Sequence, residues 1–281
     1  MNYLQTLNFG SHKLKSNNIK THILDSELLL SHIINKPREY VLLNFQAKIT
    51  KNNFREYNNL LLRRKQGEPI AYITKKKEFW KSNFFVNKDV LIPRPETEII
   101  VEQVLNETSI STNKRLLEVG TGSGCIIISV LKERLNCQAT AIDISKKAIN
   151  IAKFNAKMHH LINKINFINI DIDNIQLNKY DFIISNPPYI NKFDFSRLDV
   201  NIRSFEPKIA LEAGVDGFRE IRKIIIKSKK LLKKNGKLIF EIGVGQHMYT
   251  KKILTENGFF INKIIKDISS IPRVVVSTKI N

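Results

Sequence analysis

Residues 115–134 read RLLEVGTGSGCIIISVLKER, and their pattern is the strongest indication of the fold class. Its first five residues are mostly apolar and predict a short buried strand, its last ten predict a helix, and a glycine turn joins the two. This arrangement lets the backbone approach a ligand closely at the carboxyl end of a sheet. The third glycine comes one residue too early for the dinucleotide-binding fingerprint, and no Gly-Lys-Ser/Thr sequence follows that would indicate a phosphate-binding loop.

Acidic residues stand at the ends of the next two predicted strands. The strand at 139–142 leads into Asp143, about twenty residues after the glycine turn, where a carboxylate can accept both hydroxyls of a ribose. Residues 145–158 have the apolar spacing of a helix, and the strand at 165–170 leads into Asp171. Asp171 could contact a ligand, or it could be an ordinary turn residue.

A proline-rich loop, Asn186-Pro187-Pro188-Tyr189, follows the apolar strand at 180–185. Two consecutive prolines cannot extend the strand, because each lacks an N–H group and fixes φ, so the loop leaves the sheet in a rigid shape. The loop presents an amide, backbone carbonyls and an aromatic ring, which together suit a planar NH2 group. A stiff strand exit would explain the prolines alone, but the glycine turn upstream favours a ligand.

We expect two domains, at residues 1–74 and 75–281. The first is predicted to be all-helical, and it either docks a substrate or only stabilises the chain. Its apolar residues recur at helical spacing, at Leu24, Leu28, Leu29, Ile33, Val41, Leu42, Leu60 and Leu61. The second is predicted to begin with a β-hairpin linker at 78–86. It continues as a doubly wound, mostly parallel α/β sheet that closes with strands at 236–243, 259–265 and 273–277, the last one inserted antiparallel.

The segment from Leu91 to Glu98 joins the hairpin to the main domain. Pro95 suits a first helical turn, and Glu96 and Glu98 complement the helix dipole there. These local effects do not explain why Arg94 stands between two prolines.

The composition indicates a large folded core and a basic surface. The chain has 281 residues, 42% of them hydrophobic, and a formal net charge of +20. The charge suits an RNA or ribonucleoprotein neighbourhood, but its dispersal also suits the codon bias of an AT-rich genome. With two cysteines, no signal peptide and no membrane-spanning apolar run, we expect a cytoplasmic protein with reduced thiols. The six histidines show no metal-ligand spacing, so no metal site is expected.

The spacing Glu-x-Gly-x-Gly-x-Gly from Glu118 to Gly124 resembles motif I of class I S-adenosylmethionine-dependent methyltransferases. The whole chain is similar to the bacterial peptide chain release factor glutamine methyltransferases, which modify the side-chain nitrogen of the glutamine in the Gly-Gly-Gln loop. That resemblance implies the seven-stranded sheet of these enzymes. The segments that carry it are 67–73, 79–80, 92–98, 118–126, 185–190, 205–211 and 216–217.

The resemblance implies S-adenosylmethionine as the cofactor and release factors as protein partners. The cofactor-binding residues that it implies are Gly120, Thr121, Gly122, Ser123, Gly124, Asp143, Asp171, Ile172 and Asn186. It implies that Asn186, Pro187, Pro188 and Tyr189 bind the substrate, and that all of these except Pro188 are catalytic. Asn186 Oδ1 and the Pro187 carbonyl would accept the two amide hydrogens, and Tyr189 would pack against the substrate side chain.

Three positions depart from the pattern of the family. Phe205 replaces a usual tyrosine, Ala213-Gly214 replaces a glycine pair, and Ile172 occupies a position that is aromatic in some relatives.

Other functions remain open at this point. A DNA or RNA amino-methyltransferase would use a similar loop, but we find no target-recognition domain and no basic insert rich in stacking residues. A ribosomal-protein glutamine methyltransferase would share the fold, but its segment at Arg94 usually lacks the Pro-x-Thr-Glu ending. A binding module without activity would not need both loops intact. We therefore expect a release factor enzyme that needs neither metal, membrane nor nucleic acid, with ribosome-proximal contact compatible with its charge.

Overall fold

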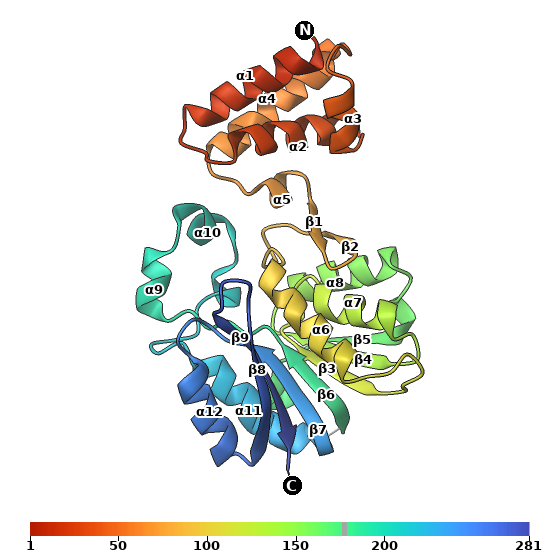
Figure 1. Ribbon diagram of the computed structural model, residues 1–281, viewed down its shortest axis with the longest axis vertical. Coiled ribbons are helices and arrows are strands. Elements are labelled where there is room, and N and C mark those ends of the chain that lie inside the picture. The colour runs from red at the N-terminus through yellow and green to blue at the C-terminus, as the bar shows by residue number, and fades with distance from the viewer. Residues whose placement is uncertain (176–178, 281) are drawn as a thin grey trace. The chain divides into compact units, whose positions relative to one another are not determined.

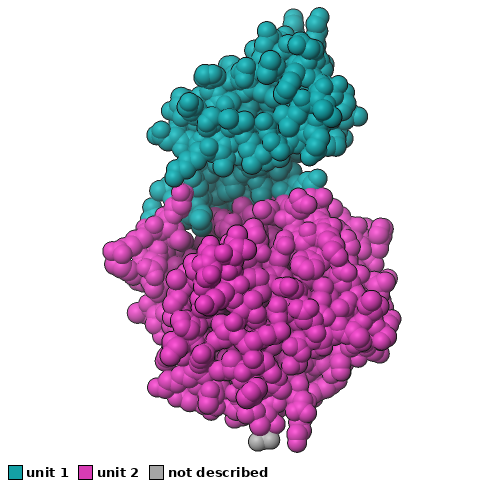
Figure 2. Space-filling model, in the orientation of Figure 1, with its two compact units in different colours: residues 1–76, 200–205 teal, residues 77–199, 206–281 magenta. Residues whose placement is uncertain are grey.

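The computed structural model describes residues 1–175 and 179–280. These residues form two compact units, which Figure 2 colours separately. One unit contains residues 1–76 together with 200–205, and the other contains the described parts of 77–199 and 206–281.

The smaller unit is helical, as its leucine spacing predicts. Its helices are α1 (Tyr3–Lys15), α2 (His22–Ile34), α3 (Arg38–Leu43), α4 (Lys51–Lys65), α5 (Ile70–Ile73) and α10 (Val200–Phe205). Helix α1 begins with a capping box, in which the Asn2 side chain accepts from the Gln5 backbone N–H and the Gln5 side chain accepts from that of Asn2. Leu29, Val41 and Leu61 are fully buried, whereas Leu24 is exposed and does not belong to the core.

The larger unit holds a seven-stranded sheet in the order β5-β4-β3-β6-β7-β9-β8 (Figure 1). Its strands are β3 (Arg115–Val119), β4 (Gln138–Asp143), β5 (Ile165–Asn169), β6 (Tyr180–Ser185), β7 (Leu232–Glu241), β8 (Phe259–Lys266) and β9 (Pro272–Lys279). All neighbours are parallel except β9, which pairs antiparallel with both β7 and β8. The predicted mostly parallel sheet with an inserted antiparallel last strand is confirmed, as is the hairpin of β1 (Lys76–Phe79) and β2 (Ser82–Phe85).

Helices cover both faces of this sheet. The α-helices of the unit are α6 (Glu98–Asn106), α7 (Cys125–Glu133), α8 (Lys146–Met158), α9 (Lys192–Arg197), α11 (Arg219–Leu231) and α12 (His247–Glu256). Short 3₁₀ helices are η1 (Pro95–Thr97), η2 (Ile162–Lys164), η3 (Ile172–Asn174) and η4 (Lys208–Ala210).

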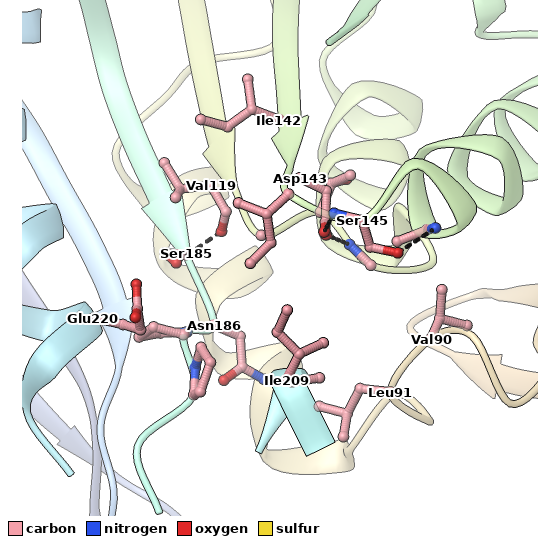
Figure 3. Close-up of a pocket in the computed structure, with 18 of the residues that line it drawn as sticks. Val90, Leu91, Val119, Ile142, Asp143, Ser145, Ser185, Asn186, Ile209 and Glu220 are labelled. Atoms are coloured by element: carbon pink, nitrogen blue, oxygen red, sulfur yellow. Dashed lines mark hydrogen bonds between the residues drawn. The ribbon is translucent and has the colours of Figure 1, made fainter. Parts of the chain in front are cut away.

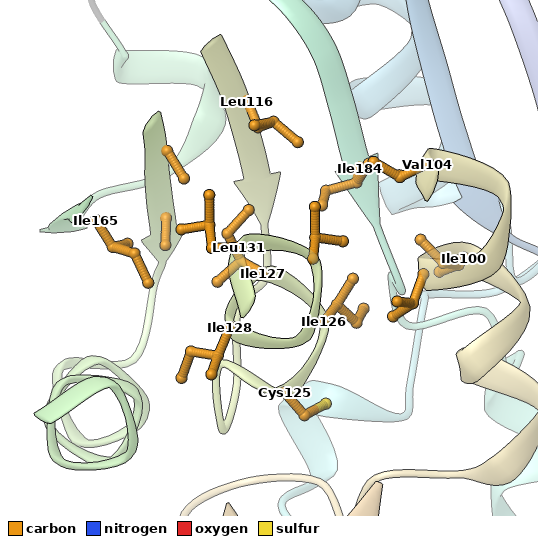
Figure 4. Packing of buried hydrophobic residues seen from close by; sticks show 14 of the residues in the cluster. Ile100, Val104, Leu116, Cys125, Ile126, Ile127, Ile128, Leu131, Ile165 and Ile184 are labelled. Carbon is orange, nitrogen blue, oxygen red and sulfur yellow. The ribbon is translucent and has the colours of Figure 1, made fainter. Parts of the chain in front are cut away.

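The central strands β3 and β6 are mostly apolar, because each face of the sheet meets a helical layer there. On β3, Leu116 packs in the cluster with α6, α7 and α8, while Leu117 packs in the cluster with α11 and α12. Figure 4 shows the first cluster, where Ile100 and Ile127 reach the sheet from two helices. This double covering explains why β3 and β6 appear in the sequence as short runs of mostly apolar residues.

Candidate functional site

The strand order reverses between β3 and β6, and the candidate site lies where these two strands end. From β3 the sheet continues to β4 and β5 in one direction, and from β6 it continues to β7 in the other. The loops after two such strands diverge, and the crevice between them is where open α/β sheets bind ligands. The glycine turn follows β3 and the Asn-Pro-Pro-Tyr loop follows β6, so both predicted loops border one cavity.

The glycine turn exposes its backbone to this cavity. Gly120 and Gly122 have φ angles of +72° and +54°, and a Cβ atom on either would meet nothing within 4 Å. Both positions therefore combine a backbone conformation that suits glycine with open space for a ligand. Gly124 differs, because its Cβ would lie 3.0 Å from Ile128 and 3.2 Å from Ala152, and it does not appear among the described residues that line the cavity.

Asp143 holds the glycine turn from the neighbouring strand. Its Oδ2 accepts from the Gly122 backbone N–H at 3.0 Å, and its Oδ1 accepts from the Ser145 backbone N–H at 2.9 Å (Figure 3). Burial raises the pKa of the Asp143 carboxyl, and these two donors oppose that shift. Each oxygen keeps a further lone pair, so Asp143 can still accept hydrogen bonds from a ligand diol.

Asp171 lies on the cavity wall together with Ile172, but its carboxylate already has partners. Its Oδ1 accepts from the Asp173 backbone N–H at 2.8 Å, and its Oδ2 lies 2.6 Å from Lys223 Nζ on α11. Ile172 is buried and gives this end of the cavity an apolar surface. Lys223 was not anticipated from the sequence, since nothing in its helix marks it as a cavity residue.

Asn186 stands at the end of β6 with its side chain held by Thr97. Asn186 Nδ2 donates to Thr97 Oγ1 at 2.9 Å, and Thr97 Oγ1 donates to Glu241 Oε2 at 2.6 Å. Because the hydroxyl has one hydrogen and gives it to the carboxylate, it can only accept from Asn186. This fixes the amide nitrogen toward Thr97 and leaves Asn186 Oδ1 available on the side of the cavity, which Pro187 and Pro188 also line.

The Tyr189 hydroxyl is also bonded to the Glu241 carboxylate. Its Oη donates to Glu241 Oε1 at 3.1 Å, and burial, followed by the nearby Glu241 charge, raises the pKa of the phenol. Tyr189 does not line the cavity in the part of the chain that the structure describes. Its contact with a substrate therefore stays a prediction.

Thr97 and Glu241 were not singled out from the sequence. Both lie inside segments that drew attention for other reasons, Thr97 in the turn after Pro95 and Glu241 at the end of a predicted strand. A buried glutamate at the carboxyl end of a central strand is the one signal that could have marked Glu241, since such residues need a partner.

Glu118 is a second buried carboxyl beside the glycine turn. Its Oε2 accepts from the Thr121 hydroxyl, and its Oε1 has no hydrogen-bond partner among the described residues. Burial is the main reason that the pKa of Glu118 is raised to about 8. The group is therefore expected to hold a proton at neutral pH.

Two classes of feature are absent from residues 1–175 and 179–280. No helix there has the length and apolar character to cross a membrane, and no cluster of three or more His, Cys, Asp or Glu side chains could hold a metal ion.

Comparison with known proteins identifies both units. Residues 5–74 match the PrmC N-terminal domain, and residues 110–270 match a methyltransferase domain. A bifunctional methyltransferase of Rickettsia conorii is 38% identical over 99% of this chain, although the chain spans only 58% of that protein. A release factor glutamine methyltransferase of Clostridium acetobutylicum is 36% identical, with 95% of this chain and 94% of that protein aligned. A methyltransferase structure from Pyrococcus furiosus shares the fold, with a TM-score of 0.54, 17% identity, and coverage of 80% of this chain and 100% of that one.

Proposed function

Because the chain belongs to the release factor glutamine methyltransferase family, we propose that it methylates the glutamine of the Gly-Gly-Gln loop in peptide chain release factors. The methyl group comes from S-adenosylmethionine and is transferred to the side-chain amide nitrogen. The near full-length match to the Clostridium protein supports this assignment over a ribosomal-protein or nucleic-acid substrate. Release factors act in the cytoplasm, so the proposed activity belongs there.

The geometry of the glycine turn supports the cofactor. Gly120 and Gly122 give a ligand close access to the backbone, and the spare lone pairs of Asp143 suit a ribose diol. Ile172 supplies an apolar wall for a base, with Asp171 at its edge. S-adenosylmethionine supplies a methyl group that its positively charged sulfur already activates, so the protein's main task is to position the two reactants.

The orientation of the Asn186 amide is the observation that carries the proposal. An amide nitrogen is a poor nucleophile because its lone pair is delocalised into the carbonyl. With its own nitrogen held by Thr97, Asn186 presents Oδ1 as an acceptor for one hydrogen of the substrate NH2 group. The Pro187 carbonyl accepts the other hydrogen, and both bonds concentrate electron density on the substrate nitrogen and aim it at the methyl group.

No general base is needed before the transfer. A bond forms between the amide nitrogen and the methyl carbon while the carbon–sulfur bond breaks, and S-adenosylhomocysteine leaves. The methylated nitrogen then carries a positive charge and is strongly acidic. It loses one proton to water or to a neighbouring acceptor, which yields the neutral methylated amide.

We assign residues 1–74 a docking role, in which they bind the release factor away from the reacting glutamine. The support is the match of residues 5–74 to a domain named after the same kind of protein, together with the absence of chemistry-bearing clusters in its sequence. A purely stabilising cap is the alternative, and a full methylation rate with altered surface residues throughout this unit would favour it.

One assay tests the proposed function directly. The full chain is incubated with S-adenosylmethionine labelled in the methyl group and with purified release factor, ribosomal proteins or DNA in separate reactions. We expect label in release factor alone, at the glutamine of its Gly-Gly-Gln loop. Label in a ribosomal protein or DNA, with none in release factor, would reject the proposal.

A further inference from the structure

The hydrogen bonds behind Asn186 form a chain that ends on a buried carboxylate. Glu241 is 2% exposed and receives Thr97 Oγ1 at 2.6 Å on one oxygen and Tyr189 Oη at 3.1 Å on the other. Thr97 is also 2% exposed, so water does not replace these partners. Thr97 lies on η1, Tyr189 in the loop after β6 and Glu241 at the end of β7. The three residues are therefore distant in the sequence.

This chain of bonds has a direction, and the direction is set at Glu241. An ionised carboxylate only accepts hydrogen bonds, so the Thr97 hydroxyl must donate to it. Thr97 is then an acceptor toward Asn186, and the amide must face it with its nitrogen. If Glu241 instead carried a proton and donated it, the Thr97 hydrogen would be free to donate to Asn186 Oδ1, and the amide would turn its nitrogen toward the cavity.

We propose that Glu241 is a positioning residue for methyl transfer, which acts through Thr97 to keep the Asn186 amide oxygen facing the cavity. The proposal rests on the proposed function, because it explains why the catalytic acceptor points toward the substrate nitrogen. An Asn186 amide turned the other way would present NH2 to the NH2 group of the substrate, and two donors would then oppose each other. Glu241 itself is not among the described residues that line the cavity.

The surroundings of Glu241 decide when it is ionised. Burial raises the pKa of its carboxyl, and the bonds from Thr97 and Tyr189 lower it. The positive charge of Arg273 on β9 also lowers this pKa, whereas the charge of Glu96 on η1 raises it. Because the net shift is upward, protonation of Glu241 begins at a higher pH than for an exposed glutamate, and turnover should fall as the pH is lowered through that range.

A matched pair of variants tests the central link. Thr97→Val removes the hydroxyl and leaves Asn186 Nδ2 without its acceptor, whereas Thr97→Ser keeps it. In single-turnover methylation of release factor, we expect Thr97→Val to be slower by a factor of about ten to one hundred, as for the loss of one hydrogen bond to a polar network. Thr97→Ser should recover most of the rate, and both variants should bind S-adenosylhomocysteine with the affinity of the parent.

Two further measurements separate positioning from mere structural support. If Thr97 and Glu241 act through Asn186, then Thr97→Val and Glu241→Gln should cause almost no further loss in an Asn186→Ala background. The acidic limb of the pH profile for kcat should disappear in Glu241→Gln and move to higher pH in Tyr189→Phe, which lacks one of the bonds that lower the Glu241 pKa. Fully additive losses, equal rates for the two Thr97 variants, or a parallel loss of S-adenosylhomocysteine affinity would each overturn the proposal.

The proposed function can fail independently of this inference. If the parent chain labels no release factor, the substrate assignment is wrong, but the orientation of Asn186 can still be measured. In ¹⁵N-labelled protein with S-adenosylhomocysteine, the side-chain NH2 signal of Asn186, assigned through Asn186→Ala, should shift strongly in Thr97→Val and little in Thr97→Ser. A signal that is equally unaffected by both variants would show that no such hydrogen-bond chain exists.

Discussion

Arg94 Nη2 contacts Glu206 Oε1 at 2.5 Å, and the second carboxylate oxygen of Glu206 accepts from the Ile92 backbone N–H at 3.2 Å. The pair connects the segment before α6 to the loop that carries η4. The residues that line the cavity include Arg94, Pro207 and Ile209. The ion pair therefore holds two walls of the cavity against each other. Flanking prolines restrict the backbone on both sides of Arg94, which explains the feature that local helix signals leave unexplained.

Removing one partner of this ion pair should destabilise the protein more than removing both charges. Arg94→Met leaves the Glu206 carboxylate, which is 5% exposed as a residue, buried without its partner. Because Arg94 is itself partly exposed, we expect a loss of about 1–3 kcal/mol in the free energy of unfolding, below the range for a fully buried pair. Urea unfolding followed by the fluorescence of Trp80, the only tryptophan, measures it.

The double variant Arg94→Met/Glu206→Gln is the control for that prediction. It leaves no charge at this pair, so it should be more stable than Arg94→Met alone. A double variant that loses the sum of the two single effects would show that the two residues do not interact.

Asp143 should be sensitive even to an isosteric change. Asp143→Asn places an NH2 group against the backbone N–H of either Gly122 or Ser145, so one favourable contact becomes a repulsion between donors. We expect the affinity for S-adenosylhomocysteine to fall by about tenfold or more, and titration calorimetry measures this. Asp181→Asn is the matched control. Asp181 also accepts from a backbone N–H, that of Arg115, but it does not line the cavity, and its substitution should leave the affinity unchanged.

The strands and their polar ends could be predicted from the sequence because both depend on local pattern. Asp143 and Asn186 each follow a mostly apolar strand, and parallel strands bring such ends to one edge of the sheet. The contact between Thr97 and Glu241 could not be predicted in this way. These residues are 144 positions apart, and no periodicity links a 3₁₀ turn to the end of β7.

At two positions, the structure shows a contact that residue type alone does not indicate. Gly124 belongs to the glycine motif, yet its lack of a side chain allows close packing against Ile128 and Ala152. Tyr189 follows the two prolines, and its hydroxyl is bonded to Glu241, while the contact of its ring with a substrate stays a prediction. In both cases the sequence shows which atoms are present, and tertiary packing decides where they point.

Glu118 should make the stability of the chain depend on pH. Its folded-state pKa of about 8 lies above the ordinary value of 4.5, so its contribution is complete below about pH 4.5 and is lost as the pH rises toward 8. The slope for one such group is at most about 1.4 kcal/mol per pH unit. Glu118→Gln cannot lose a proton, so its unfolding free energy, followed by Trp80 fluorescence, should fall less than that of the parent between pH 5 and pH 8. Parallel pH profiles for the two proteins would contradict a raised pKa at Glu118.

Gly10 in helix α1 should resist replacement by alanine. A Cβ atom there would lie 1.9 Å from the Tyr57 hydroxyl, which is fully buried and bonded to Ser26 Oγ at 2.6 Å. Alanine gains about 1 kcal/mol in helix propensity, but we expect the clash to outweigh it and destabilise the helical unit by about 1–3 kcal/mol. Urea unfolding followed by helical circular dichroism tests the sign. Tyr57→Phe removes the clashing oxygen, so adding it to Gly10→Ala should restore part of the loss.

Asn186 should affect the rate of methyl transfer much more than the binding of the cofactor. Asn186→Ala removes one acceptor from the substrate amide at the stage when the nitrogen develops charge. We expect turnover to fall by about two to three powers of ten, as for the loss of one oxyanion-hole donor. Asn186→Asp keeps an oxygen in the same place and should be faster than the alanine variant. It should remain slower than the parent, because a carboxylate oxygen then competes with Glu241 for the single hydrogen of Thr97.

Single-turnover methylation of release factor with saturating S-adenosylmethionine measures the rates of the parent and of both Asn186 variants, and S-adenosylhomocysteine affinity reports whether the cavity is intact. If the alanine variant transfers methyl as fast as the parent, the Asn-Pro-Pro-Tyr loop is only a rigid exit from β6 and the catalytic assignment fails.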